Sequence, residues 1–263
     1  MYAFDYHRPS SLNEATSALA AHPGAKLLAG GHTLIPALKL RLAEPGHLVD
    51  LARVDGLQEL AVDGGVLRIG AMVTHATVAG SDVVKKAIPG LAALASGIGD
   101  PHVRHRGTIG GSVANNDPAA DYPAAVLALG ATVQTTKRKL AAEDFFQGLF
   151  TTALEDDEIL TRIDIPVPKS FTYAKFANPA SRYALVGVAV ANTSAGPRVA
   201  VTGAGESGVF RLKAAEAALT SDFSAKAVEK LTVPAAGLMS DIHAEADYRA
   251  HLIGVMLRRA LGG

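Results

Sequence analysis

The sequence contains no cysteine among its 263 residues. Disulfides, thiolate catalysis and cysteine-based zinc sites are therefore excluded, and so is any iron–sulfur cluster held by this chain alone. Basic and acidic residues balance, since lysine plus arginine and aspartate plus glutamate number 25 each. Without a broad basic field, we expect the protein to bind neither nucleic acid nor an anionic membrane through charge.

Long apolar runs are absent as well. The longest stretches without a charged residue span 122–136 and 183–197, and both are shorter than the roughly 18 to 20 apolar residues of a membrane helix. Segment 1–8 carries an acid and aromatic residues where a signal peptide has basic and then apolar ones. We therefore predict a cytoplasmic protein without a membrane span.

The composition is that of a folded protein, with 49% hydrophobic and 19% charged residues. The length suits two domains or one large one. The stiff segment Pro166-Val167-Pro168-Lys169 interrupts the pattern of short elements. We place the domain boundary there, which gives domains 1–168 and 169–263.

Short strands and helices are expected throughout. The spacing of Ser11 and Glu14 is that of a capping box and predicts a helix that ends at 22–24. Apolar periodicity and turn residues predict helices from about 33, between 74 and 96, from 121 or 124 to 129, at 209–219 and at 248–261. Strands are expected at 26–29, 47–51, 66–72, 131–135, 158–165, 171–176, 183–191 and 198–202.

Two glycine pairs, Gly30-Gly31 and Gly110-Gly111, lie in loops next to predicted helices. A bound pyrophosphate needs several converging N–H donors, and glycine lets the backbone come close because it has no Cβ. A glycine pair alone is more often only a turn. The second pair, however, is followed by polar groups suited to phosphate, sugar hydroxyls and ring edges, namely Ser112, Asn115, Asn116, Asp117 and Asp121. Two such loops would suit a long dinucleotide.

A third glycine motif, at 203–208, fits G-x-G-x-x-G and imitates a dinucleotide-binding fingerprint. The chain after Gly208 offers no second parallel strand that ends in an acid for a ribose. A tight turn is therefore the better interpretation.

Other polar residues carry weaker signals. Asp100, His102 and His105 have no fixed ligand spacing, so we read them as a surface loop and predict no metal. The acidic run 155–158 is interpreted as a solvated turn before a strand. His32 suits a phosphate contact, a covalent flavin bond or a plain loop position. No grouping of serine, histidine and aspartate supports a hydrolase.

The two loops together resemble a known family. Segments 29–36 and 108–121, in this order and about 80 residues apart, are similar to the two flavin motifs in the medium subunits of molybdenum hydroxylases. This family includes the medium subunit of aerobic carbon monoxide dehydrogenase and its xanthine dehydrogenase relatives. The similarity covers essentially the whole chain, with further matching segments at 4–9, 39–42, 47–51, 158–160 and 256–260.

The resemblance implies an α+β fold. A FAD-binding domain of the vanillyl-alcohol oxidase type would consist of two α+β subdomains that meet near 52–56. A smaller α+β domain of the carbon monoxide dehydrogenase flavoprotein type would follow. FAD would lie between the two parts of the first domain.

The resemblance also implies residues that bind FAD without a covalent bond. The family's first loop falls on Ala29, Gly30, Gly31, His32, Thr33 and Leu34. The second falls on Thr108, Gly110, Gly111, Ser112, Ala114, Asn115, Asp117 and Asp121. Leu160, Lys175 and Tyr183 fall near the flavin, with Tyr183 beside its ring. The resemblance implies no catalytic acid or base and no metal ligand.

By the same resemblance, the partners are a large subunit with a molybdenum cofactor and a small subunit with two [2Fe-2S] clusters, assembled as a dimer of heterotrimers. This chain would pass electrons from those clusters through FAD to an acceptor such as a quinone or oxygen. The missing cysteines agree with that division of cofactors. Two alternatives remain open, a stand-alone flavin oxidase with His32 as covalent anchor and a non-catalytic assembly subunit.

Overall fold

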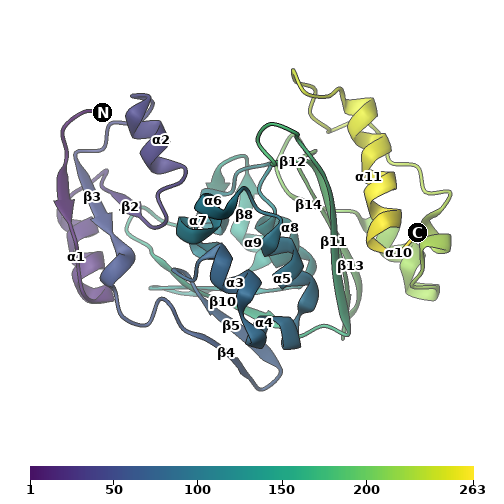
Figure 1. The fold of residues 1–263 in the computed structure, drawn as a ribbon, viewed down its shortest axis with the longest axis horizontal. Helices are drawn as coiled ribbons and strands as arrows, with labels where there is room; N and C mark the ends of the chain where they lie inside the picture. Colours follow the sequence, from purple (N-terminus) through teal and green to yellow (C-terminus); the bar gives the residue numbers. More distant parts are fainter.

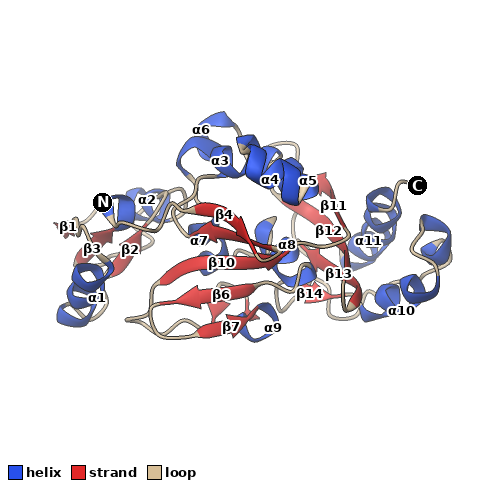
Figure 2. Ribbon diagram, turned by 90° about the horizontal axis from the view of Figure 1, so that it is seen from below, coloured by secondary structure: helices blue, strands red, loops and turns tan.

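A computed structural model describes the whole chain, residues 1–263. Three main sheets follow one another along the molecule, each with its own helices (Figure 1). The N-terminal part lies at one end of the molecule, the C-terminal part at the other, and a five-stranded sheet lies between them (Figure 2). The predicted mixed α+β class is confirmed.

The N-terminal part is a small parallel sheet with two helices. Its strands pair in the order β1-β3-β2, and α1 begins where Ser11 Oγ accepts a hydrogen bond from the Glu14 amide at 3.2 Å. The Glu14 carboxylate accepts from the Ser10 amide at 2.7 Å, one residue earlier than in the predicted capping box. The elements are β1 (Asp5–His7), α1 (Leu12–Ala21), β2 (Lys26–Leu28), α2 (Leu34–Lys39) and β3 (His47–Asp50).

The middle part is an antiparallel sheet flanked by short helices. The strand order is β4-β5-β10-β6-β7, and the strands are β4 (Leu60–Asp63), β5 (Val66–Gly70), β10 (Leu160–Pro166), β6 (Thr132–Thr135) and β7 (Lys139–Ala141). The helices are α3 (His75–Gly80), α4 (Asp82–Ala87), α5 (Pro89–Ser96), α6 (Pro101–Arg106), α7 (Ile109–Asn115), α8 (Tyr122–Ala128) and α9 (Ala142–Phe145). A 3₁₀ turn, η1 (Leu51–Arg53), leads into this part, and β8 (Phe146–Gly148) pairs with β9 (Thr151–Thr152).

The C-terminal part is an antiparallel sheet between two layers of helices (Figure 1). Along its second strand, Val186, Val188 and Val190 belong to the C-terminal core, whereas Ala189 and Ala191 belong to the middle core. This two-residue period packs one face on the C-terminal helices and the other on α5 and α8. The elements are β11 (Ser170–Ala177), β12 (Ala184–Thr193), β13 (Gly196–Thr202), β14 (Phe210–Arg211), α10 (Lys213–Ser221), η2 (Ala225–Val228) and α11 (Ala246–Ala260).

Some sequence predictions are wrong in detail. The helix predicted at 209–219 begins only at Lys213, because Phe210 and Arg211 pair with β13. In the acidic run 155–158, Glu158 is not solvated but buried. Arg138, Thr135 Oγ1 and the Glu155 amide all donate hydrogen bonds to its carboxylate. These donors lower the pKa of Glu158 to about 2, although burial acts in the opposite direction.

No helix combines the length and the apolar character that a membrane crossing requires. The division into 1–168 and 169–263, with a subdomain boundary near 52–56, stays a proposal. The cytoplasmic location likewise stays a prediction.

Candidate functional site

The first glycine loop connects β2 to α2. Gly31 has a φ of +75°, a left-handed conformation that side chains rarely adopt, and its carbonyl accepts the Ile35 amide at 3.0 Å as α2 begins. The backbone N–H groups of Gly30, Gly31, His32 and Thr33 donate no hydrogen bond to another group of the chain. The loop therefore presents a row of free amide donors of the kind that binds phosphate oxygens.

The second glycine loop opens α7. Thr108 is its N-cap, and Thr108 Oγ1 accepts the Gly111 amide at 3.1 Å. Gly110 lies against the chain at Ala71, where its amide donates to the Ala71 carbonyl at 2.9 Å. A Cβ on Gly110 would lie 2.6 Å from that oxygen, so only glycine fits there. Gly110 therefore lets α7 pack against the chain at Ala71, and its amide is not free to bind a ligand.

The fold brings the two glycine loops into contact. A Cβ on Gly30 would lie 2.2 Å from the Arg106 carbonyl oxygen, and a Cβ on Gly111 would lie 3.4 Å from Ala29 Cβ. His32 Nε2 lies 3.4 Å from the carbonyl oxygen of His102. Loops that are about 80 residues apart in the sequence thus form one site.

Polar side chains extend this site along α7. Ile109, Gly110 and Val113 are buried, whereas Gly111, Ser112, Ala114 and Asn115 are partly exposed. The side chains of Ser112 and Asn115 make no hydrogen bond within the chain, so they remain available to a ligand. Asn116, in contrast, is buried and donates to the carbonyls of Gly148 and Thr151 at 2.8 and 2.9 Å.

The segment after α7 joins the site to the C-terminal part. Tyr173 Oη donates to Asp121 Oδ1 at 2.5 Å, and Lys175 Nζ lies 3.0 Å from the same oxygen. Lys175 Nζ also donates to the carbonyls of Gly97 and Arg182, both at 3.0 Å. Burial raises the pKa of Asp121, although Lys175 and Tyr173 favour the charged form.

Two further predicted residues lie at this junction. Asp117 Oδ1 accepts the Ala119 amide at 2.9 Å, and the Ala119 carbonyl accepts the Ala184 amide at 3.2 Å. Tyr183, directly before β12, is 47% exposed. Burial raises the pKa of its hydroxyl, and the carboxylates of Asp117 and Asp121 add to the rise. Tyr183 is thus a half-exposed aromatic side chain beside the acidic end of the second loop.

Leu160 is a predicted residue that belongs to the hydrophobic core beneath α7, and it is only 4% exposed. Thr108 and Asp121 are equally buried, but their side chains make the polar contacts described above. The other predicted positions divide into the two touching loops and the junction formed by Asp117, Asp121, Lys175 and Tyr183. Direct contact of each predicted residue with a cofactor stays a prediction.

Two residues that pack beneath the site, His75 and Tyr173, carry no signal in the sequence. His75 is buried, its ring lies 5.3 Å from that of Tyr122, and a Cβ on Gly107 would lie 2.5 Å from His75 Nε2. Burial lowers the pKa of His75 to about 4, so its ring is neutral near pH 7. Neither His75 nor Tyr173 belongs to a glycine motif, and no local pattern in the sequence marks them.

The remaining motifs have structural roles. The motif at 203–208 is a turn after β13 in an antiparallel sheet, and Arg249 donates to the Gly203 carbonyl. The interpretation as a tight turn is confirmed. The surface loop expected at Asp100, His102 and His105 is wrong, because this segment forms the helix α6. Asp100 Oδ1 caps α6 by accepting the Val103 amide at 2.9 Å, and His105 Nδ1 lies 3.0 Å from the Pro101 carbonyl.

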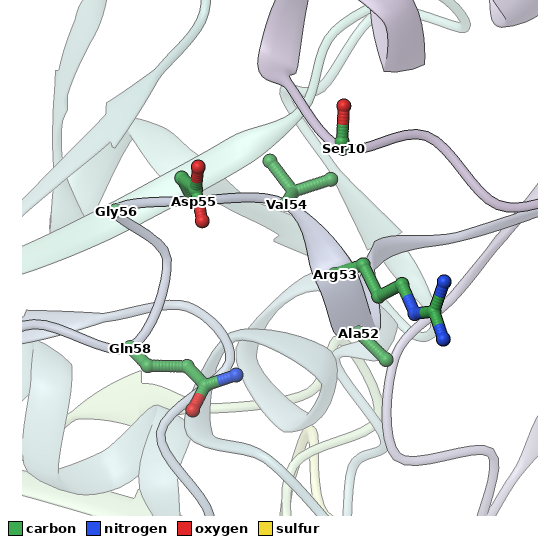
Figure 3. A pocket seen from close by; sticks show the side chains of 7 residues that line it. All are labelled: Ser10, Ala52, Arg53, Val54, Asp55, Gly56 and Gln58. Atoms are coloured by element: carbon green, nitrogen blue, oxygen red, sulfur yellow. The ribbon is translucent and has the colours of Figure 1, made fainter.

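A separate pocket lies beside the linker between the N-terminal and middle parts. Ser10 comes from the segment before α1, and the other lining residues come from 52–58 (Figure 3). Arg53 and Asp55 supply charges of opposite sign. None of the predicted cofactor residues lines this pocket, so the two glycine loops remain the candidate site.

Fold and site together define a nucleotide-binding flavoprotein of a known class. The family described as "FAD binding domain in molybdopterin dehydrogenase" matches residues 2–168. The chain therefore belongs to the family of FAD-binding medium subunits of molybdopterin dehydrogenases. It is an oxidoreductase subunit of the carbon monoxide dehydrogenase and xanthine dehydrogenase type.

Individual relatives match over nearly their full length. The carbon monoxide dehydrogenase medium chain of Afipia carboxidovorans is 40% identical over 98% of this chain and 96% of the relative. The nicotine 6-hydroxylase medium subunit of Paenarthrobacter nicotinovorans is 36% identical over the same shares, 98% and 96%. Reconstituted CO dehydrogenase from Oligotropha carboxidovorans contains a chain with a TM-score of 0.91 and 36% identity, with 100% of this chain and 98% of that one covered.

Proposed function

We propose that this chain is the electron outlet of a heteromeric molybdenum hydroxylase. FAD held by the two glycine loops would accept electrons from iron–sulfur clusters of a small partner subunit and deliver them to an external acceptor such as a quinone or oxygen. A large partner subunit would hold the molybdenum cofactor and oxidise the substrate, in a dimer of heterotrimers. The observation that carries the proposal is the contact between the two loops, together with the lack of cysteine.

The first loop supplies the donors for the diphosphate. Four consecutive amides, from Gly30 to Thr33, are free of internal partners, and the left-handed Gly31 lets them converge. A Cβ on Gly111 would lie 2.9 Å from Thr108 Oγ1 and 3.4 Å from Ala29 Cβ, so glycine lets the cap of α7 and the first loop come close together. On α7, Ser112 and Asn115 offer a hydroxyl and an amide for the remaining polar groups of the nucleotide.

The junction with the C-terminal part positions the flavin end. Lys175 has hydrogen-bond partners on three segments, so it fixes Asp121 relative to the chain at Gly97 and Arg182. Tyr183 lies beside Asp117 and Asp121 and is half-exposed, so it would be the aromatic neighbour of the flavin ring. The protein's part in the reaction is to hold the ring near the partner's cluster and to tune its potential through nearby charge and hydrogen bonds.

The proposal is tested on the assembled complex, without knowledge of its substrate. Complexes that contain the natural chain or Gly111→Val are reduced with limiting dithionite and mixed anaerobically with a water-soluble quinone. Cluster reoxidation is followed by visible absorbance and electron paramagnetic resonance. We expect rapid reoxidation with the natural chain and slow reoxidation with flavin-free Gly111→Val. Equal rates would contradict the proposal and support an assembly subunit.

A further inference from the structure

Three histidines of the N-terminal part lie together outside the cofactor site. His7 ends β1, His22 is the C-cap of α1 and His47 opens β3. One ring nitrogen from each lies within 4.8 Å of the other two, and all three residues are partly buried. His7 Nε2 and His47 Nδ1 are 3.0 Å apart, and the rings of His22 and His47 stack with centroids 3.8 Å apart.

The fold explains why these histidines meet. In the parallel pairing of β1 and β3, Asp5 lies opposite His47, and His7 lies opposite Val49. Because strand residues two apart share a face, His7 and His47 lie on the same face as Val49, which packs with Ala15 and Leu19 of α1. The end of α1 brings His22 to the edge of the sheet where β3 begins.

This edge is distinct from the cofactor site. The first glycine loop follows the C-terminal end of β2, whereas His47 stands at the N-terminal end of the adjacent parallel strand β3. His22 and His47 therefore lie at the N-terminal end of the sheet, His7 lies on the edge strand β1 away from β2, and no histidine of the cluster belongs to the glycine loop.

We propose that His7, His22 and His47 bind one divalent transition-metal ion, with Zn²⁺ as the ion that the donor set suits best. Imidazole nitrogen is a preferred ligand of Zn²⁺, and three histidines leave one position for water or a carboxylate. At Zn–N distances of about 2.0 to 2.1 Å, tetrahedral geometry places the nitrogens about 3.3 Å apart. The three nitrogens already lie within 4.8 Å of one another, and binding requires the stacked rings of His22 and His47 to turn toward the ion.

The surroundings of the cluster favour a cation. The Asp5 carboxylate lies 3.7 Å from His47 Nδ1 and is exposed, so it can move to the metal or orient a bound water. The nitrogens of His7 and His47 point at each other across a hydrogen bond. An ion that enters between them takes the place of the shared proton, which moves to the other nitrogen of the same ring or is released to water.

The role of the ion would be structural. The core around the N-terminal sheet has eight buried residues, against 31 in the middle core. Small parts with small cores gain most from a cross-link. An ion at this position would tie together three segments, the end of β1, the end of α1 and the start of β3. This inference does not depend on the proposed electron transfer.

The test uses the full-length chain, free of any polyhistidine tag and stripped of metal with a chelator, with and without FAD. Zn²⁺ is titrated by calorimetry, and Co²⁺ is added separately to observe the visible bands of tetrahedral coordination. We expect one ion per chain in both FAD states and a Tm that rises with Zn²⁺ concentration. A chain that binds no Zn²⁺, or binds it without a rise in Tm, would overturn the proposal.

Variants locate the ion. His22→Gln and His7→Gln each remove one ligand and should weaken Zn²⁺ binding by more than the roughly 10- to 100-fold loss typical of outer-shell changes. The matched control His251→Gln alters an exposed histidine of α11 and should bind Zn²⁺ like the natural chain. Circular dichroism establishes that each variant is folded. Unchanged Zn²⁺ affinity in folded His22→Gln or His7→Gln would place the ion elsewhere and contradict the site.

Discussion

At the scale of single residues, the first and second glycines of each pair have different roles, and these roles are the same in both pairs. The first glycine of each pair allows a close internal approach, of Gly30 to the Arg106 carbonyl and of Gly110 to Ala71. The second glycine shapes the site, Gly31 through its left-handed backbone and Gly111 through its closeness to Thr108 Oγ1 and Ala29. In each pair, one glycine thus allows close packing within the fold and the other shapes the proposed cofactor site.

The clearest test at this scale is Gly31→Val. A β-branched residue at a φ of +75° is strained, and its Cβ would lie 2.6 Å from Ile35 Cδ1, so the loop must change its shape. We expect loss of FAD from the purified chain. Gly46→Val is the matched control, because Gly46 has no positive φ and nothing lies within 4 Å of an added Cβ. Flavin content that is equal in both variants would contradict the role of the loop.

Lys175 supports a second prediction. Lys175→Met leaves the Asp121 carboxylate buried without its cation, and removal of one partner of a buried pair costs about 3 to 5 kcal/mol. The double variant Asp121→Asn with Lys175→Met should recover part of this loss, because the uncompensated charge is gone. Urea unfolding of the two single variants and the double variant measures the coupling. Additive effects would show that the pair does not interact.

At the scale of elements, α7 depends on its N-cap. Thr108→Ala removes the acceptor for the Gly111 amide, and loss of such a cap typically costs about 1 kcal/mol. We expect lower stability together with weaker FAD binding, because the cap holds Gly111 in place. Ser11→Ala removes the equivalent cap of α1 away from the site and should lower stability alone. Both quantities follow from urea titration and flavin fluorescence, and similar FAD affinity in the two variants would count against this role.

The elements that could be predicted from the sequence are those with a local signal. The α1 cap, the strand at 26–28 and the valines of β12 follow from spacing and periodicity. The apolar pattern predicts a helix at Phe210 and Arg211, because it does not show their pairing with β13, whose residues lie about ten positions earlier in the chain. The acidic run alone predicts a solvated Glu158, since the sequence does not show that Arg138 and Thr135 donate hydrogen bonds to it from another segment.

At the scale of the whole molecule, the middle part depends on a neutral His75. The folded-state pKa of about 4 lies below the usual 6.5, so the unfolded chain binds more protons between these values. The contribution to stability is complete above pH 6.5 and is lost as the pH falls toward 4, by about 3 kcal/mol in all.

The variant His75→Leu tests this pH dependence. No hydrogen bond of the His75 ring is lost, since its Nδ1 has no partner. We expect the free energy of unfolding of His75→Leu to change less between pH 6.5 and 4 than that of the natural chain. The exposed His105 serves as control through His105→Gln, which should keep the natural slope. A slope unchanged in His75→Leu would mean that other groups cause the acid sensitivity.

The candidate site could be predicted only in part, because it is formed by segments that are distant in the chain. Its two loops carry glycines that are visible in the sequence, and Lys175 was expected near the flavin only through the family resemblance, whereas Tyr173, which reaches Asp121 from another sheet, carries no local signal. The three clustered histidines are likewise separated along the chain and have no ligand spacing. Contacts between distant segments are set by the packing of the three parts, which no local pattern encodes.

The most direct test of the account is the visible absorption spectrum of this chain, purified alone and with its neighbouring subunits, followed by acid precipitation. We predict a flavin spectrum and release of about one FAD per chain into the supernatant, as expected for non-covalent binding. Flavin that stays with the precipitate would indicate a covalent anchor such as His32. A colourless protein in both preparations would contradict the assignment of the two loops to FAD.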